Sequence, residues 1–343
     1  MTTITRPTKE TRAPGTGPSR DLTQRGPGVL ADRAFSLVSL GAGLLVLIIL
    51  ALILVTTTGQ ALPALREAGL DLIFGDRWIA NDPDGDGPAT PRFGALAMIY
   101  GTGVVSVIAL LFAVPVSIGI ALFLTEVAHR RVRGPVVTAI DLLAALPSVV
   151  FGLWGILVVG PALTKVYDRI FALVGDVPLL GSVFGQPVST GRTFMTAGLI
   201  LAIMITPIVT SLTREVFTTV PETEKHAVLA LGATRWEMIK GAVFPHSFGG
   251  IVGAVMLGLG RAMGETIAVA LTIGAAIQIT PNVFASGEAL PAVIVRQWGE
   301  SGGTHRSALI GLGVVLFAIT VTVNLLARVI VRRAEIRMKG AAA

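Results

Sequence analysis

Six long apolar segments alternate with polar segments along the chain. The pattern predicts membrane-spanning helices at residues 34–55, 94–125, 135–163, 193–213, 248–279 and 307–327. The first segment has no charged residue over 22 positions, and at about 1.5 Å per residue it is long enough to cross a hydrocarbon core of roughly 30 Å. It is also longer than a signal-peptide core of about 7–15 residues. The pattern therefore indicates an all-α integral membrane protein with six transmembrane helices.

The polar segments divide the chain into four parts. Residues 1–33, rich in Thr, Pro, Gly and Arg, show no hydrophobic periodicity and are predicted to form a disordered tail. Residues 34–93 comprise the first span and an external segment. Residues 94–331 form a core of five further spans, and residues 332–343 form a short basic tail.

The external segment contains a short acidic run. Asp82-Pro83-Asp84-Gly85-Asp86-Gly87 matches the opening of an EF-hand calcium loop. The twelfth position of such a loop is a bidentate glutamate, and Phe93 stands there in this chain. We therefore expect a solvated acidic turn rather than a calcium site.

Charged residues are few and lie mostly at the edges of the apolar spans. They make up 14% of the 343 residues, against about 25% in a soluble domain. If the N-terminus is cytoplasmic, the two tails and the loops at 129–134 and 214–246 hold 18 of the 27 Lys and Arg residues, and the opposite side holds eight. The positive-inside rule therefore places both termini in the cytoplasm. Because the basic residues set an orientation, the net charge of +6 does not indicate a nucleic-acid partner.

The composition excludes several kinds of chemistry. There is no cysteine, and the four histidines are scattered, so neither thiolate chemistry nor a histidine metal site is expected. No Gly-Lys dipeptide occurs, which excludes a Walker A loop and leaves any ATP to another chain. We find no cluster of His, Asp or Glu for a membrane enzyme and no obvious internal repeat for a secondary transporter. No catalytic residue and no cofactor are predicted.

The loop between the fourth and fifth spans is predicted to fold into two short helices. Thr219-x-x-Glu222 and Thr234-x-x-Glu237 both fit the capping box, and Gly232 suits a left-handed turn between them. We predict helices at about 220–231 and from about 235, before Pro245 marks the next span. Their apolar residues are too many for helices in water: Val228, Leu229, Leu231, Trp236, Met238 and Ile239. Such a pair either lies on the lipid or docks into a groove of a partner protein.

This loop resembles the Glu-Ala-Ala signature of permease subunits of bacterial ABC importers. The equivalent positions are His226-Ala227-Val228, Gly232 and Ala242-Val243-Phe244-Pro245. The glycine, one alanine and the proline match, whereas histidine replaces the glutamate. Three longer motifs, at 146–155 (LPSVVFGLWG), 230–237 (ALGATRWE) and 257–266 (LGLGRAMGET), are similar to those of phosphate-specific transport permeases of the PstC type. The resemblance covers about 94–331.

The resemblance implies a type I ABC importer permease core in the plasma membrane of a bacterium, with coupling helices at about 219–245. The implied partners are a second permease subunit of the PstA type, two ATP-binding subunits of the PstB type, an external phosphate-binding protein of the PstS type, and membrane lipid. The residues implied to contact the ATPase are His226, Ala227, Val228, Gly232, Thr234, Arg235 and Trp236. A permease for another oxyanion, such as sulfate or molybdate, is the alternative within the same class.

Two charged residues inside the fifth span are candidates for the substrate path. Arg261 and Glu265 are four residues apart and are predicted to share one helix face. Each costs roughly 2.5–3.5 kcal/mol at the centre of a bilayer, so the pair should face the bundle interior or a wet cavity. Either they form a structural salt bridge, or Arg261 binds phosphate while Glu265 offsets its charge. Ser148 and Thr266 could add hydroxyl donors to this path.

Overall fold

The computed structural model describes residues 29–79 and 92–341 of the chain. Most of the predicted tail, the acidic run at 82–87 and the last two residues lie outside the described residues. Within the described part, six helices are long and apolar enough to cross a membrane, which confirms the hydrophobic pattern. The chain divides into two compact units, Met1–Leu54 and Val55–Ala343.

The first unit contains the beginning of α1 (Val29–Ala68). Nearly all of its described side chains are exposed, including Phe35, Leu44 and Ile48. A helix that is apolar on every side is typical of a membrane span in contact with lipid.

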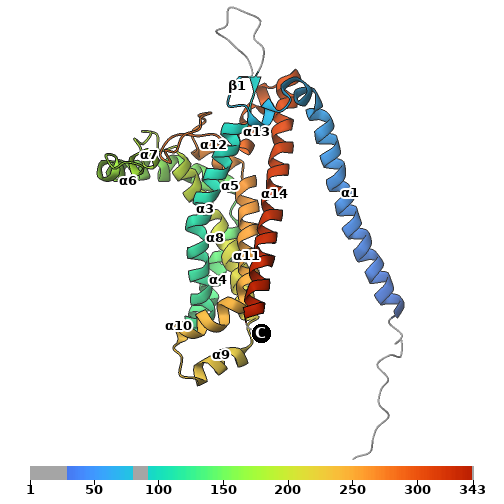
Figure 1. The fold of residues 1–343 in the computed structure, drawn as a ribbon, viewed down its shortest axis with the longest axis vertical. Helices are drawn as coiled ribbons and strands as arrows, with labels where there is room; N and C mark the ends of the chain where they lie inside the picture. Colours follow the sequence, from blue (N-terminus) through green and yellow to red (C-terminus); the bar gives the residue numbers. More distant parts are fainter. Residues whose placement is uncertain (1–28, 80–91, 342–343) are drawn as a thin grey trace, which may run out of the picture. The chain divides into compact units, whose positions relative to one another are not determined.

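The second unit contains the remaining elements, which Figure 1 draws as a bundle with short helices at both ends. Their bounds are α2 (Asp71–Phe74), β1 (Trp78–Ile79), β2 (Arg92–Phe93), α3 (Leu96–Leu122), η1 (Phe123–Val127), α4 (Arg130–Ala145), α5 (Ser148–Trp154), η2 (Gly155–Val159), α6 (Gly160–Val174), α7 (Leu180–Val183), α8 (Phe194–Thr218), α9 (Glu222–Ala230), α10 (Arg235–Met238), η3 (Ile239–Val243), α11 (Phe244–Gly264), α12 (Ile267–Thr272), α13 (Leu290–Gln297), η4 (Trp298–Glu300) and α14 (Gly303–Ala341). The two strands pair antiparallel, with Trp78 opposite Phe93.

The core of the bundle is the pair α3 and α8, and α11 packs on both of these helices and on α14. Small residues line the contact between α3 and α8, among them Ala109, Ala113 and Ala197. At Gly198 on α8, a Cβ would lie 2.4 Å from a side-chain carbon of Ile108 on α3, so only glycine allows this approach. Small side chains let the backbones come close, as is usual where helices pack inside a membrane.

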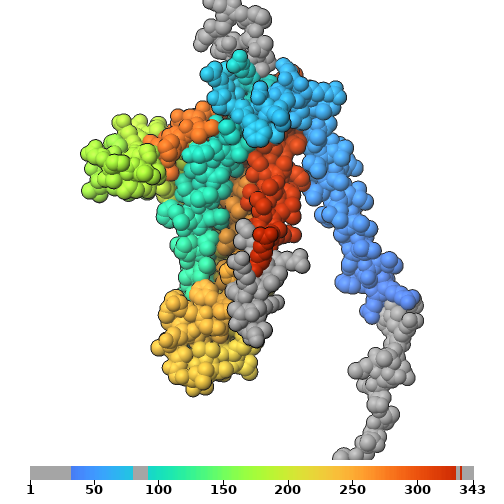
Figure 2. All heavy atoms as spheres, viewed as in Figure 1, coloured from blue at the N-terminus to red at the C-terminus, as the bar shows by residue number. Residues whose placement is uncertain are grey.

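The third predicted span, 135–163, is not one continuous helix. α4 ends at Ala145, and Leu146 is extended with ψ 134° before α5 begins at Ser148. The proline ring of Pro147 disfavours a helical conformation for the preceding residue, which explains the break. Beyond α5, η2 and α6 continue the helix to Val174, and Ser148–Val174 is the apolar span found in the structure. In Figures 1 and 2, α6 projects sideways from the bundle.

The fifth predicted span, 248–279, is also divided. The helix formed by α10, η3 and α11 runs from Arg235 to Gly264, and α12 begins only at Ile267. Glu265 between them is extended, with ψ 128°. The two charged residues of this span therefore do not share one regular helix, which corrects the prediction made from their spacing.

Candidate functional site

The two short helices α9 and α10 lie at one end of the bundle, opposite β1 (Figures 1 and 2). Gly232 between them has φ +83°, the left-handed conformation expected there. Thr234 and Glu237 form the predicted capping box: the Glu237 amide donates to the Thr234 hydroxyl at 3.3 Å, and the Thr234 amide donates to the Glu237 carboxylate at 2.7 Å. The other predicted capping box is wrong, because α9 begins at Glu222 after Pro221 and has no side-chain cap.

The outer face of these helices presents apolar side chains to the surroundings. Leu231 is 88% exposed and Trp236 is 56% exposed, with the Lys240 ammonium 5.6 Å from the centre of the Trp236 ring. Of the other residues expected to contact an ATPase, Val228 is half-buried. The rest are exposed, namely His226, Ala227, Gly232, Thr234 and Arg235. We call the exposed set, together with Leu231 and Trp236, the docking surface. Clustered aromatic and apolar residues on a short rigid helix pair are typical of a protein interface.

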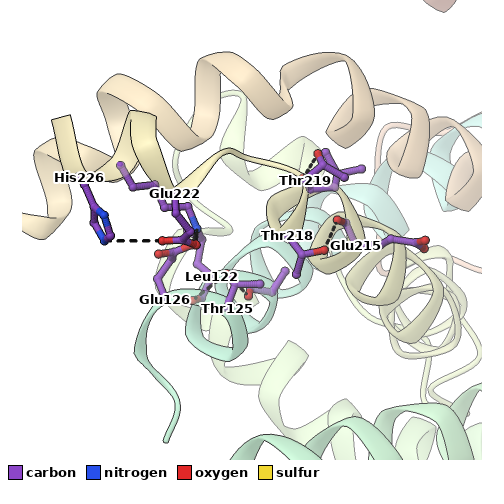
Figure 3. A network of polar contacts seen from close by, with 11 residues as sticks. Leu122, Thr125, Glu126, Glu215, Thr218, Thr219, Glu222 and His226 are labelled. Atoms are coloured by element: carbon purple, nitrogen blue, oxygen red, sulfur yellow. Dashed lines mark hydrogen bonds and ion pairs between the residues drawn. The ribbon is translucent and has the colours of Figure 1, made fainter. Parts of the chain in front are cut away.

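The inner face of α9 is held to the bundle by an ion pair that the sequence pattern did not indicate. The Lys225 ammonium donates to the Glu126 carboxylate of η1 at 2.9 Å, and the two side chains are only 9% and 10% exposed. Lys225 also reaches Glu222 at 3.3 Å, and His226 lies 4.0 Å from Glu222 (Figure 3). Burial lowers the pKa of the Lys225 ammonium, but the hydrogen bond and charge of Glu126 outweigh this effect and raise the pKa above its usual value.

A second polar contact joins α9 to the beginning of α11. The His246 ring nitrogen lies 3.4 Å from the Glu224 carboxylate, and both side chains are partly exposed. Beneath the helices, Val220, Met238 and Val243 form an apolar cluster with residues of α3, α8 and α11. α9 is thus attached to two different long helices, α3 through η1 and α11 directly.

We expect the capping box to stabilise α10 measurably. Replacing Thr234 by alanine removes the hydroxyl acceptor and should cost about 1 kcal/mol, so that α10 opens about fivefold more often. Tryptic cleavage after Arg235 in detergent should then be about fivefold faster. Thr219→Ala is the matched control, because Thr219 caps the N-terminus of neither α9 nor α10; its hydroxyl donates to the Val216 carbonyl at the end of α8. An unchanged cleavage rate in Thr234→Ala would contradict this role for the cap.

Arg261 faces a groove of about 990 Å³ between α8, α11 and α14. The residues that line the groove are Ile208, Gly249, Val252, Gly253, Met256, Leu257, Gly260, Arg261, Asn324 and Arg328. The Arg261 side chain is exposed to this space and forms no ion pair or hydrogen bond with any described residue. A guanidinium on an apolar membrane helix is therefore free to meet an anion.

Glu265 and Thr266 lie at the break between α11 and α12, and neither they nor Ser148 line this groove. The Glu265 carboxylate accepts a hydrogen bond from the Ala268 amide at 3.3 Å and thus caps α12. The Thr266 hydroxyl donates to the Gly264 carbonyl at 3.2 Å. Neither Glu265 nor Thr266 contacts Arg261 through a polar bond within the described residues.

Ser148 lies at the same end of a neighbouring helix. A Cβ on Gly152 would lie 3.0 Å from Cα of Ala268, and a Cβ on Gly155 would lie 2.6 Å from a side-chain carbon of Thr272. α5 and α12 therefore run side by side in the same direction. This brings the beginnings of the two helices, with Ser148 and Thr266, to the same level. The predicted path residues therefore form two groups, Arg261 in the groove and Glu265, Thr266 and Ser148 at the beginnings of α5 and α12.

A separate buried polar cluster lies near the end of the bundle that carries β1. The Glu288 side chain is almost fully buried, pairs with Arg296 and accepts a hydrogen bond from the Ala289 amide. Burial raises the pKa of the Glu288 carboxyl, whereas the Arg296 guanidinium lowers it. The Thr102 hydroxyl on α3 accepts from the Leu290 amide at 3.0 Å. The buried Arg296 Nε has no hydrogen-bond partner. The Glu288 carboxylate and the Thr102 hydroxyl both bond within the chain, and the cluster has the properties of a structural support for α13.

No group of three or more His, Cys, Asp or Glu side chains converges in the part of the chain that the structure describes. The chemistry available in the described site is therefore that of a free guanidinium in a groove and an exposed docking surface. The two are joined by one helix, since α10, η3 and α11 run without interruption from Arg235 to Gly264.

Comparison with known proteins identifies the family. A family model described as "Binding-protein-dependent transport system inner membrane component" matches residues 113–336. The chain is 40% identical over 327 residues to the phosphate transport system permease protein PstC of Xylella fastidiosa (strain Temecula1), covering 95% of this chain and 96% of that protein. It is 39% identical over 326 residues to PstC of Mesorhizobium japonicum, covering 94% and 97%. It is 37% identical over 321 residues to PstC 2 of Mycobacterium tuberculosis, covering 92% and 97%.

Among solved structures, an inward-facing conformation of the MetNI methionine ABC transporter matches with a TM-score of 0.45 and 16% identity, over 69% of this chain and 94% of that chain.

The family model covers more than half of the chain, and the three relatives named above each cover more than nine-tenths of it. The chain therefore belongs to the family of binding-protein-dependent transport system inner membrane components, together with the PstC permease proteins.

Proposed function

We propose that this chain is the PstC-type permease subunit of an ATP-driven importer of inorganic phosphate. The observation that carries the proposal is the free guanidinium of Arg261 in a groove on a membrane helix. Guanidinium offers a planar fork of donors that matches two phosphate oxygens, and it stays charged at any physiological pH. The names of the relatives, all phosphate transport permeases, support phosphate as the anion.

The energy for transport comes from partner chains. The docking surface at 226–236 would contact an ATP-binding subunit of the PstB type, and the continuous helix Arg235–Gly264 would carry the movement of that subunit to Arg261. Residues 94–331 are the permease core in this proposal. A second permease of the PstA type completes the path, and a binding protein of the PstS type delivers phosphate from outside. Both termini lie in the cytoplasm of a bacterium, in accord with the positive-inside rule.

Outside the groove, the path would be lined by Glu265, Thr266 and Ser148, where the first turns of α5 and α12 meet. Glu265 would keep the local charge balanced, so that phosphate is attracted but is released again. Conduction requires binding strong enough for entry and weak enough for exit.

Copurification and competition test this proposal. When the chain is tagged and extracted in mild detergent, a second permease and an ATP-binding subunit should come with it. In proteoliposomes that contain the complex and the loaded binding protein, unlabelled phosphate should suppress uptake of labelled phosphate, whereas excess sulfate or molybdate should not. Suppression by sulfate or molybdate instead of phosphate would show that the chain is a permease for another oxyanion.

The proposed orientation is tested separately. The natural chain has no cysteine, so single cysteines can be labelled without background. A cysteine replacing Thr234 should react with an impermeant thiol reagent only from the cytoplasmic side, and one replacing Arg92 should react only from outside. The reverse pattern would contradict the proposed topology.

A further inference from the structure

The groove that contains Arg261 holds a second guanidinium that pairs with no described residue. Arg328 and Asn324 of α14 both line it, and they are four residues apart, which places them on one face of that helix. On the α11 side the lining extends from Gly249 to Arg261. At about 1.5 Å per residue this stretch is roughly 18 Å long, more than half of a hydrocarbon core of about 30 Å. The groove is therefore long enough to form a substantial part of a route through the membrane.

The two arginines lie toward opposite ends of the groove. α11 runs away from the α9–α10 end of the bundle and α14 runs back toward it (Figure 1). Arg261 is in the last turn of α11, whereas Arg328 lies one helical turn nearer the α9–α10 end than Asn324. From the α9–α10 end, an anion would thus meet Arg328 and Asn324 on one wall, and Arg261 at the far end of the other.

Within the described residues, no side chain balances the charges in the groove. No carboxylate is among the residues that line it, and neither guanidinium forms an ion pair or hydrogen bond with a described residue. The rest of the lining is glycine, valine, methionine, leucine and isoleucine, apart from the Asn324 amide. Two cations without a counterion on an otherwise apolar wall indicate that a mobile anion supplies the negative charge.

We propose that this groove is the inward half of the anion path, in which Arg261 passes phosphate to a second binding position formed by Arg328 and Asn324. The inference rests on the proposed function and extends it to two residues of α14. Asn324 offers amide donors for phosphate oxygens without adding a third charge. Two weak positions in series allow an anion to move on, whereas one strong position would hold it.

The glycines of α11 give the path its width. A Cβ on Gly253 or on Gly260 would meet no other atom within 4 Å. A larger side chain therefore fits without a clash but occupies the groove. A Cβ on Gly119 of α3 would likewise meet no other atom within 4 Å, but Gly119 lies outside the groove. Gly253→Leu and Gly119→Leu thus form a matched pair, since each gains the same helix propensity and only the first narrows the path.

Uptake by the reconstituted complex tests the proposal. Arg328→Gln and Gly253→Leu should each lower the maximal rate of phosphate uptake about tenfold, while both variants retain the second permease on purification. Arg333→Gln and Gly119→Leu should transport at nearly the normal rate. Normal uptake by Arg328→Gln would overturn the proposal. So would loss of the second permease from Arg328→Gln and Gly253→Leu, which would make the groove a subunit interface instead.

A labelling experiment gives a readout that does not depend on transport. In the cysteine-free chain, Asn324→Cys should react with a negatively charged, membrane-impermeant thiol reagent, and inorganic phosphate should slow that reaction. Val321→Cys is the control, because Val321 is partly exposed but does not line the groove; it should not react. Equal reactivity at the two positions, or none at Asn324→Cys, would contradict a water-filled path. If the complex carries another oxyanion, the same variants measured with that ion still test the groove.

Discussion

Arg261→Gln should reduce ATP-driven phosphate uptake at least 100-fold while the complex still assembles. Glutamine keeps the approximate length and some donors of arginine but removes the charge. An anion that enters an apolar groove without a cation loses several kcal/mol of hydration with no compensation, and each 1.36 kcal/mol added to a barrier slows passage tenfold. The measurement is uptake of labelled phosphate into proteoliposomes, with copurification of the second permease as the check on assembly.

Arg261→Lys is the informative companion variant. Lysine keeps the charge but lacks the planar fork that can bind two phosphate oxygens, so uptake should fall by about tenfold rather than to background. Wild-type uptake by Arg261→Gln, with a normally assembled complex, would remove Arg261 from the path. The free side chain in the groove would then need another explanation, such as a contact with the second permease.

Lys225→Met should uncouple ATP hydrolysis from uptake. The substitution leaves the Glu126 carboxylate, only 10% exposed, without its partner. Breaking a buried ion pair in this way costs about 3–5 kcal/mol, enough to release α9 from η1 and α3. The docking surface on the outer face stays intact, so the ATPase should still bind and hydrolyse ATP. We expect the amount of phosphate moved per ATP hydrolysed to fall about tenfold.

Two further variants separate coupling from simple folding. Exchanging the charges with Lys225→Glu and Glu126→Lys should restore at least part of the ratio of uptake to hydrolysis. Glu222→Gln should have little effect, because the Glu222 side chain is 71% exposed and exposed pairs contribute about 0–1 kcal/mol. If Lys225→Met keeps the normal ratio, the movement of the ATPase reaches the bundle through α11 alone.

The ion pair should also persist over a wide pH range. The pKa of Lys225 is raised in the folded protein, so its stabilising effect is fully present below the ordinary lysine pKa of about 10.4. It is lost only as the pH rises through the higher folded value. The Lys225–Glu126 pair should therefore cause no change in the amount of phosphate moved per ATP hydrolysed by the wild type between about pH 6 and pH 9. A loss of coupling within that range would point to other groups.

The apolar runs were enough to predict the six membrane helices, because length and hydropathy alone decide whether a segment can cross a bilayer. The turn at Gly232 and the cap at Thr234 were also predictable, since each depends on neighbouring residues only. The breaks at Pro147 and Glu265 were missed. Both lie inside apolar runs, where hydropathy does not report whether the backbone stays helical.

The tertiary contacts of the candidate site could not be predicted in the same way. Lys225 and Glu126 are 99 positions apart, and no local pattern indicates that they meet. Arg328 directly follows the last predicted span, 307–327, and its place in the groove is seen only when α14 lies beside α11. The sequence indicated this second binding position only through Asn324, which is a polar residue inside an apolar span, one turn before an arginine. Conversely, the spacing of Arg261 and Glu265 suggested a shared helix face that the backbone does not form.

The most direct test is ATP-driven phosphate uptake by the reconstituted complex of this chain, a second permease, the ATP-binding subunits and the loaded binding protein. Labelled phosphate should accumulate inside proteoliposomes only when ATP and an active ATPase are on the side that carries α9 and α10. Accumulation without ATP, or none with all components present and active, would contradict a permease whose docking surface drives an anion past Arg261.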